Sequence, residues 1–241
     1  MEKGSRRDRP VIEVRRLRKE YIMGQERVVA LKDISLSIMR GEICCIFGTS
    51  GSGKSTLLNQ LAGLEKPTRG QVLIGGVPVS RLSENSLAAF RQKHVGFVFQ
   101  SYNLLPELTA VENVAMPLMF RGVPKTAREL EAKKMLCRVG LGSRMNHYPG
   151  QMSGGQQQRA GIARAFITRP DIVFADEPTG NLDSRTTKEV MEMIQRFART
   201  FHQTIVLVSH DPEMTEYADR IVTLMDGEII RDVKTGGETE K

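Results

Sequence analysis

The segment GTSGSGKST, residues 48–56, has the residue types and spacing of a loop that binds phosphate groups. It matches G-x-x-x-x-G-K-[ST] in full, between a run typical of a buried strand (EICCIF) and one typical of a helix (LLNQLAGL). Glycines let main-chain N–H groups curl around phosphates, Lys54 supplies positive charge, and the Ser55 hydroxyl can ligate Mg²⁺. Rather than an ordinary glycine-rich turn, we predict a nucleotide site made of Gly48, Thr49, Ser50, Gly51, Ser52, Gly53, Lys54, Ser55 and Thr56.

Two consecutive carboxylates, Asp176 and Glu177, end an apolar run in IVFADEP, residues 172–178. Ligands of parallel α/β sheets bind at the carboxyl ends of strands, so both side chains should project toward a nucleotide. Asp176 suits Mg²⁺, directly or through water, and Glu177 is free to polarise a water, because phosphoanhydride hydrolysis needs a positioned nucleophile and charge neutralisation. The alternative is a capped turn after a core strand; the phosphate loop elsewhere in the chain favours the catalytic interpretation.

A second candidate for anion binding is the helix start in QMSGGQQQRAGIARA, residues 151–165. Ser153 can cap a helix that begins near Gly155, and Gly154 and Gly155 would let the bare main-chain N–H groups of this helix approach a phosphate closely. The predicted phosphate-binding residues here are Ser153, Gly154, Gly155 and Gln156. Neither a second lysine nor a second carboxylate pair accompanies it, so it is half a site. A two-fold dimer would complete two such sites, each phosphate loop facing this segment of the other copy; the alternative is a helix start without a ligand.

Hydrophobic periodicity indicates that an α/β domain with a mainly helical insertion positions these motifs. Short alternating runs from Val11 to about Leu82 predict strands, with one helix after the phosphate loop. The pattern is largely helical from about Leu87 to Met145, and after Met152 helix and strand alternate. Continuous β-branched runs such as TIVLV suit a sheet buried on both faces.

Two helices have recognisable ends or faces. In TARELEAKKMLCRVG, Thr126 and Glu129 predict a capping box and Gly140 predicts the end of the helix. Residues 184–201 carry apolar side chains at a 3.6-residue period, which predicts an amphipathic helix. The tail, residues 234–241, is expected to fray.

Composition narrows the class of protein. A hydrophobic content of 40% suffices for a core, and neither a signal peptide nor an apolar run near the roughly 20 residues of a membrane span is recognisable, so we expect a soluble, non-secreted chain. Cys44, Cys45 and Cys137 lack the spacing of a zinc site and are expected to be reduced cytosolic core residues.

The net charge of +7 could suit nucleic acid or an anionic membrane face. Much of it lies in scattered positions and in the run RRDRPVIEVRRLRK, which lacks the interleaved aromatic residues that stack on bases. We therefore expect no nucleic-acid partner.

Together, these motifs resemble those of the ATP-binding cassette (ABC) ATPase family. The resemblance covers about Val11 to Val233 and rests on GTSGSGKST, Gln100 after GFVF, MSGGQQQR, FADEP, the NLD of residues 181–183, and His210 after TIVLVS. It implies a P-loop NTPase fold in a single domain, residues 1–241, with an N-terminal antiparallel β subdomain and a helical subdomain at about 87–165. It also implies ATP and Mg²⁺ as cofactors and an ATP-dependent homodimer.

The same resemblance implies roles for individual residues. Lys54 and Glu177 would be catalytic, Glu177 as the general base, and His210 would contact the γ phosphate and hold Glu177 in place. Gln100, His210 and Tyr21 have simpler alternatives, as a turn residue, a turn cap and a core residue respectively. The remaining implied roles are magnesium ligation for Gln100 beside Ser55 and Asp176, adenine stacking for Tyr21, and communication across the dimer for Asp183.

The segment after Gln100, residues 101–123, and the stretch ADEPTGNLDS are similar to one subgroup of this family. It includes macrolide exporters (MacB type), lipoprotein-release ATPases (LolD type), peptide-resistance ATPases and the division-associated cassette. The similarity implies a cytoplasmic ATPase, peripheral on the inner face of the membrane, whose separate transmembrane permease docks near Gln100 and residues 101–120. The apolar residues there either offer the docking pocket or pack as the core of the insertion: Tyr102, Leu104, Leu105 and Leu108.

The function that this resemblance implies is the ATP-hydrolysing motor of a bacterial ABC export or extrusion complex. Two alternatives stay open. One is a regulatory ATPase of a cell-division or envelope-signalling complex that transports nothing, and the other is a soluble cassette ATPase that acts on nucleic acid.

Overall fold

The computed structural model describes residues 10–24 and 26–235, which divide into two compact units. Unit 1 runs to Arg91 and resumes at Thr204, and unit 2 is Gln92–Gln203. Most of the tail that was expected to fray, residues 236–241, lies outside the described residues.

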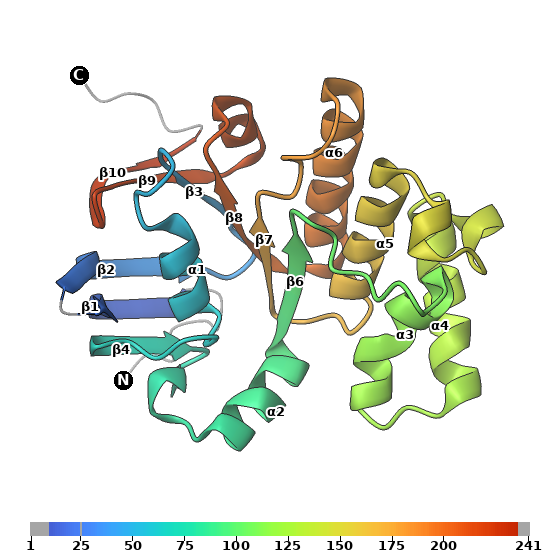
Figure 1. Ribbon diagram of the computed structural model, residues 1–241, viewed down its shortest axis with the longest axis horizontal. Helices are drawn as coiled ribbons and strands as arrows, with labels where there is room; N and C mark the ends of the chain where they lie inside the picture. Colours follow the sequence, from blue (N-terminus) through green and yellow to red (C-terminus); the bar gives the residue numbers. More distant parts are fainter. Residues whose placement is uncertain (1–9, 25, 236–241) are drawn as a thin grey trace, which may run out of the picture. The chain divides into compact units, whose positions relative to one another are not determined.

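Unit 1 contains an antiparallel sheet with the order β2-β1-β4-β5 (Figure 1). In β2, alternate residues such as Leu36 and Ile38 are buried, because successive side chains of a strand point to opposite faces. The predicted N-terminal antiparallel β subdomain is thereby confirmed. Its strands are β1 (Pro10–Met23), β2 (Glu26–Met39), β4 (Arg69–Ile74) and β5 (Val77–Pro78).

Unit 1 also contains the strands that lead into and out of the phosphate loop. Strand β3 (Ile43–Phe47) lies parallel to both β8 (Thr204–Ser209) and β9 (Arg220–Met225), and β10 (Glu228–Lys234) is antiparallel to β9. All six residues of β8 are buried, as the run TIVLV predicted for a strand covered on both faces. The helical elements are α1 (Lys54–Leu61), η2 (Val79–Arg81), η5 (Pro212–Tyr217) and α2 (Glu84–His94), whose last turn enters unit 2.

Unit 2 combines a parallel strand pair with a group of helices. Strands β6 (Val95–Phe99) and β7 (Ile172–Asp176) pair in parallel, and Phe97 stacks on Phe174 across them with ring centroids 5.6 Å apart. Helix α5 contacts β6 and the helices α3, α4 and α6, so it is the central helix of the unit. The helical elements are α3 (Ala110–Phe120), α4 (Lys125–Arg138), η3 (Gly142–Arg144), η4 (Pro149–Gln151), α5 (Gly154–Phe166) and α6 (Ser184–Phe201).

The predicted capping box of Thr126 and Glu129 is wrong. Helix α4 begins at Lys125 after the N-cap Pro124, so Thr126 already lies within the first turn, and Glu129 instead pairs with Lys125 (3.7 Å). A proline at the N-cap holds its own φ near the helical value, which lets the helix start before the threonine. The predicted end is confirmed, since the helix stops at Arg138, and Gly140 adopts the left-handed conformation (φ 77°).

The expectation that all three cysteines are core residues is wrong for Cys137. Cys44 and Cys45 are buried in β3, whereas Cys137 is exposed. The buried residues of α4 recur at helical spacing (Ala132, Met135, Leu136), and Cys137 falls on the opposite, solvent-facing side.

No helix in residues 10–24 and 26–235 has both the length and the apolar character needed to cross a membrane.

Candidate functional site

The phosphate loop connects the buried strand β3 to α1, as its sequence predicted. Gly51 and Gly53 have φ values of 79° and 100°, which side chains with a Cβ rarely adopt. Gly48 is needed for a different reason: a Cβ there would lie 2.3 Å from the carbonyl oxygen of Leu224 in β9. The glycines of this loop therefore serve both its curvature and its packing on the strand beside it.

The chemistry of the loop fits a phosphate group. Lys54 is only 6% exposed, and its ammonium donates to the carbonyl oxygen of Thr49 (2.8 Å). Within residues 10–24 and 26–235, no carboxylate pairs with Lys54, and the buried hydroxyl of Ser52 has no hydrogen-bond partner. Because a buried ammonium without a counter-ion is costly, an anion in the loop would be stabilising. The exposed Ser55, in the first turn of α1, carries a hydroxyl of the kind that ligates Mg²⁺.

Tyr21 lies near the end of this loop. Its hydroxyl donates to Glu65 (2.7 Å) and also interacts with the side chain of Thr56, which follows Ser55 in α1. Burial and the bond to Glu65 raise the pKa of Tyr21. The ammonium of Lys19 lies 4.9 Å from the ring centroid, so a cation already covers the ring. Adenine stacking by Tyr21 stays a prediction.

His210 is placed at the same sheet edge as the phosphate loop. Strands β3 and β8 are parallel with Phe47 opposite Ser209, so the next residues, Gly48 and His210, leave neighbouring strands at their carboxyl ends. The side chain of His210 is exposed. Unit 1 thus brings together the lysine loop and the predicted γ-phosphate residue.

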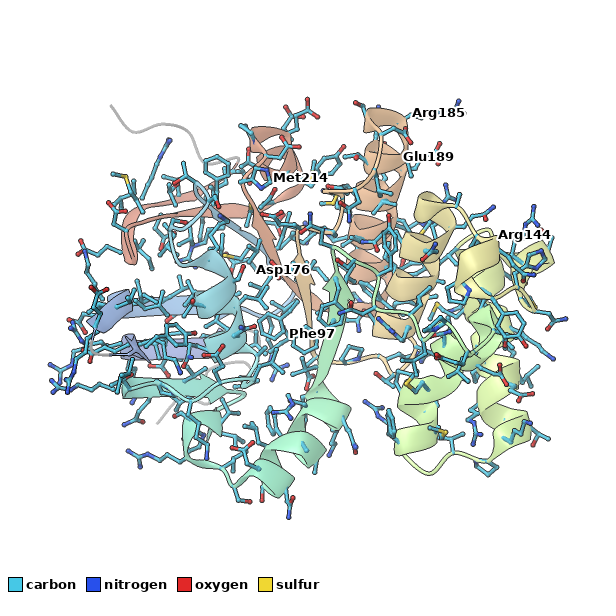
Figure 2. The ribbon with its side chains drawn as sticks, viewed as in Figure 1. Phe97, Arg144, Asp176, Arg185, Glu189 and Met214 are labelled. Atoms are coloured by element: carbon cyan, nitrogen blue, oxygen red, sulfur yellow. The ribbon has the colours of Figure 1, made fainter. Side chains whose placement is uncertain are left out.

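Unit 2 brings Gln100 together with the two carboxylates. Phe99 pairs with Asp176 across β6 and β7, so Gln100 and Glu177 follow at the same edge; Figure 2 labels Asp176 on β7. The side chain of Asn181 donates to the carbonyl oxygen of Gln100 (3.1 Å). A Cβ at Gly180 would lie 2.7 Å from the Gln100 amide nitrogen, so a larger residue there would displace the Gln100 side chain.

Glu177 has an unusual backbone conformation. Its φ is 42°, in the left-handed region, which costs a residue with a Cβ about 1 to 3 kcal/mol. Two bonds hold this turn: the Gly180 N–H donates to the Glu177 carbonyl (3.1 Å), and Gln158 donates its side-chain amide to the Pro178 carbonyl. Gln158 is fully buried on α5, and sequence reasoning missed it; its signal is a polar side chain on the inner face of that helix.

The SGGQ helix start is capped by its own side chains. The Ser153 hydroxyl accepts from the Gln156 N–H (3.3 Å), and the Gln156 side chain accepts from the Ser153 N–H (3.0 Å). The predicted cap at Ser153 is thus confirmed, and together with Gln156 it forms a capping box; the helix starts at Gly154, one residue before the predicted position. Because these bonds use the N–H groups of Ser153 and Gln156, those of Gly154 and Gly155 are the ones that can face an anion.

Both glycines of this motif also face close neighbours within unit 2. A Cβ on Gly154 would lie 2.8 Å from the Tyr102 hydroxyl, and one on Gly155 would lie 2.8 Å from the Thr186 methyl. Thr186 is itself fixed by Asp183, the N-cap of α6, which accepts from the Thr186 N–H (3.0 Å) and hydroxyl (2.7 Å). These bonds lower the pKa of Asp183. The structure therefore shows Asp183 as a helix cap near the SGGQ motif, and its role across a dimer stays a prediction.

Arg164 on α5 ties the SGGQ helix to the segment after Gln100. Its guanidinium donates to the carbonyl oxygens of Tyr102 (2.8 Å) and Asn103, and burial lowers its pKa. Tyr102 and Asn103 have φ values of 61° and 49°, so the arginine holds two consecutive left-handed residues in place. The sequence pattern did not single out Arg164.

Asn113 on α3 holds the far end of the same segment. It is fully buried, and its side-chain amide donates to the carbonyl oxygens of Leu105 (3.0 Å), Leu108 (2.9 Å) and Thr109 (3.1 Å). Its side-chain oxygen accepts from the Leu105 N–H (2.8 Å). Sequence reasoning missed this residue, although a lone asparagine in the apolar helix AVENVAMP was a usable signal.

The apolar residues after Gln100 do not share one role. Tyr102 packs on Gly154, Leu105 is 45% exposed, and Leu108 lines a hollow of about 150 Å³ in unit 2. Its lining combines apolar side chains with side chains of both charges. Its other lining residues are Glu112, Ala115, Met116, Met119, Lys125, Arg128 and Glu129.

A phosphate loop between a buried strand and a helix, an acidic pair at a strand end, and a capped SGGQ helix define an ATPase cassette of the P-loop class. The model of the ABC transporter family matches residues 31–180, and the chain belongs to this family. It is therefore an ABC ATPase, and the predicted fold and enzyme class are confirmed.

Relatives of the predicted subgroup support the same conclusion. The lipoprotein-releasing system ATP-binding protein LolD of Geobacter metallireducens is 46% identical over 222 residues, which cover 92% of this chain and 99% of LolD. The ABC transporter ATP-binding protein MJ1508 of Methanocaldococcus jannaschii is 50% identical, over 91% of this chain and 98% of MJ1508. The macrolide export protein MacB of Shewanella oneidensis is 45% identical over 93% of this chain, which spans only 34% of MacB.

Among solved structures, the fold matches a dimeric post-hydrolysis state of the ATP-binding cassette MJ0796 bound to ADP and Pi. The TM-score is 0.88 at 41% identity, and the match covers 94% of this chain and 99% of that one.

Proposed function

We propose that this chain is the ATP-hydrolysing motor subunit of an export or extrusion complex. It dimerises on ATP and drives a separate transmembrane permease from the inner face of the membrane. Two likenesses support this: LolD, named for a lipoprotein-releasing system, matches over nearly its whole length, and MacB, named for macrolide export, matches over the part that this chain spans.

The phosphate loop holds the nucleotide. The uncompensated charge of Lys54 and the buried Ser52 hydroxyl suit the phosphate oxygens of ATP, and Tyr21 stacks on the adenine. Ser55, Gln100 and Asp176 hold Mg²⁺, which when bound neutralises charge on the phosphates.

Glu177 is the general base. Its carboxylate accepts a proton from the water that attacks the γ phosphate, while His210 contacts that phosphate and orients the carboxylate. The strained turn at Glu177, held by the Gln158 amide on the next peptide, fixes the direction in which the base projects.

The capped SGGQ helix is the observation that best supports the proposed ATP-dependent dimer. Its side chains satisfy the N–H groups of Ser153 and Gln156, and those of Gly154 and Gly155 remain for a phosphate. The motif lacks a cation of its own, so it suits a nucleotide already held by the phosphate loop of a second copy. Asp183, which caps the helix beside Gly155, communicates across this interface.

The permease docks near Gln100 and residues 101–120. The exposed Leu105 and the hollow lined by Met116 and Met119 offer apolar contacts there, and no nucleic acid takes part. Asn113 of α3 and Arg164 of α5 hold the two ends of this segment. Because α5 is the SGGQ helix, a displacement of the segment by the permease would also displace that helix.

The test is whether Glu177→Gln, which binds ATP without hydrolysing it, becomes a stable dimer with ATP. We expect a monomer without nucleotide and a dimer with ATP by light scattering on a sizing column. Adding Lys54→Ala to this variant is the matched control and should abolish the dimer. A Glu177→Gln protein that binds ATP yet stays monomeric at high concentration would contradict the proposal.

A further inference from the structure

A basic hollow of about 660 Å³ lies on the antiparallel sheet of unit 1. Four arginines line it, and none of its lining residues belongs to the phosphate loop or to any other site predicted above. These residues are Arg15, Arg16, Arg18, Asp33, Arg69, Gly70 and Gln71.

An irregularity in β1 gathers these arginines. The pairing of β1 with β2 shifts between Val14 and Leu17, where two residues of β1 stand against Ser35 alone. Arg16 has a φ of 45° and donates its N–H to the Ser35 hydroxyl (3.0 Å), which is the geometry of a β-bulge. A bulge interrupts the alternation of side chains, so Arg15 and Arg16 line the same hollow although they are consecutive.

Strand β4 closes on this bulge through a glycine. A Cβ on Gly70 would lie 2.2 Å from the Arg16 carbonyl oxygen, and Gly70 itself has a φ of 88°. Only a glycine therefore fits at this position. This close approach holds Arg69, its neighbour in β4, at the same hollow as the arginines of β1.

The positive charge of the hollow is only partly compensated: Arg15 pairs with Glu13, Arg18 pairs with Glu20, and Arg69 also helps to lower the pKa of Glu20. Of the lining residues that the structure describes, Asp33 is the only one with a carboxylate. Arg15 and Arg18 each use their Nε to bind a neighbouring glutamate, which leaves most of the five N–H donors of each guanidinium available. In residues 10–24 and 26–235, no carboxylate lies within salt-bridge distance of Arg16 or Arg69.

We propose that this hollow binds a phosphate ester group, from a phospholipid headgroup or from a soluble phosphate ester. The paired N–H donors of a guanidinium match the oxygens of a phosphate group, and several guanidinium groups around one hollow favour a singly or doubly charged oxyanion. Among the described residues that line the hollow none is aromatic, so they provide no stacking surface of the kind that single-stranded nucleic acids require. The site assigns a use to the arginine-rich stretch VRRLRK, which the nucleotide chemistry leaves without a role.

The experiment compares two double variants. One carries Arg16→Gln and Arg69→Gln, and the matched control carries Arg81→Gln and Arg231→Gln. The control removes the same charge from exposed positions of unit 1 outside the hollow. Binding is measured to phosphatidylglycerol and phosphatidylcholine vesicles by flotation. It is measured to glycerol 3-phosphate by titration calorimetry, with ADP present so that the phosphate loop is filled.

We expect the natural chain to bind at least one of the two phosphate probes, and the Arg16 and Arg69 changes to weaken that binding at least about tenfold, while the control pair changes it less than about twofold. If the Arg16 and Arg69 changes weaken binding to phosphatidylglycerol vesicles, the ligand is a lipid headgroup. If they weaken binding to glycerol 3-phosphate, the ligand is a soluble phosphate ester. Binding should fall with salt, because the contacts are charged and accessible to solvent.

Three results would overturn the proposal: neither probe binds, the control pair weakens binding equally, or a DNA duplex binds more tightly than both probes and depends on the same two arginines. Circular dichroism spectra should match among all variants, because the changed side chains are exposed. ATP-driven dimerisation of Glu177→Gln should survive the Arg16 and Arg69 changes, so failure here is distinguishable from failure of the proposed motor function.

Discussion

The hydroxyl oxygen of Tyr102 occupies the space beside Gly154, 2.8 Å from where a Cβ of that residue would lie. Tyr102 belongs to the segment after Gln100, and Gly154 is the first residue of the SGGQ helix. A glycine at position 154 therefore has two roles: it leaves room for the Tyr102 hydroxyl, and it presents a main-chain N–H at the start of the helix.

Gly154→Ala should separate these two roles. We expect a loss of about 1 kcal/mol or less in the free energy of unfolding, since the clashing atom is the tip of a flexible side chain. Adding Tyr102→Phe should recover it, because the nearest ring atom is then 3.7 Å away. Urea unfolding checks both variants, and an unrecovered loss in the double variant would mean that the tyrosine hydroxyl is not the obstacle.

Arg164→Lys should destabilise the chain although it keeps the charge. A single ammonium cannot span the Tyr102 and Asn103 carbonyls as the guanidinium does, and one charge-assisted bond is worth about 1.5 to 3 kcal/mol. We expect a loss of that order in urea unfolding. Arg164→Met, which removes both bonds, should cost more. Equal stability of Arg164→Lys and the natural chain would show that a point charge is enough.

Asn113→Ala should cost on the order of 2 to 4 kcal/mol, because it removes all the hydrogen bonds of a fully buried side-chain amide, including those to the N–H of Leu105 and the carbonyl of Leu108. Asn181→Ala is the matched control: its side chain is exposed and makes one bond, to the Gln100 carbonyl, so we expect less than about 1 kcal/mol. Both are measured by urea unfolding, and similar losses would contradict the assigned difference.

The sequence predicted the elements whose signals are local. The phosphate loop, the helix of residues 184–201 and the cap at Ser153 follow from short patterns of glycine, capping and apolar residues, and the structure has them close to where they were predicted. The start of α4 was misplaced because Pro124, two positions before Thr126, serves as the N-cap.

The parts that were not predicted depend on contacts between distant segments. Arg164 binds carbonyls 61 and 62 positions earlier in the chain and has no motif of its own. Asn113 has none either, and its role appears only once the loop of residues 105–109 folds back over its side chain. The second reason for glycine at Gly154 and Gly155 is likewise visible only once Tyr102 and Thr186 lie beside them. Cys137 was misassigned because a cysteine alone does not indicate which face of a helix it occupies.

Stability should fall as pH rises above about 8.5. Burial raises the pKa of Cys44, and it raises the pKa of Cys45 to about 12, while an unfolded thiol titrates near 8.5. Below that pH both states keep the protons. Above it, only the unfolded state loses them, which destabilises the fold by up to about 1.4 kcal/mol per pH unit for each thiol, until the folded thiols also titrate.

Urea unfolding between pH 8 and 10 checks this, with Cys44→Ala and Cys45→Ala combined as the comparison. The free energy of unfolding of this double variant should fall less steeply with pH than that of the natural chain, whatever its value at pH 8. Parallel slopes for the two proteins would show that the thiols do not contribute.

Because Cys44 and Cys45 are neighbours in one strand, their sulfurs point to opposite faces of β3, and both faces are covered. The chain thus carries two native reporters of transient opening around the strand that leads into the phosphate loop. With the exposed Cys137 replaced, the rate at which each remaining thiol reacts with a labelling reagent would time the uncovering of one face separately from the other.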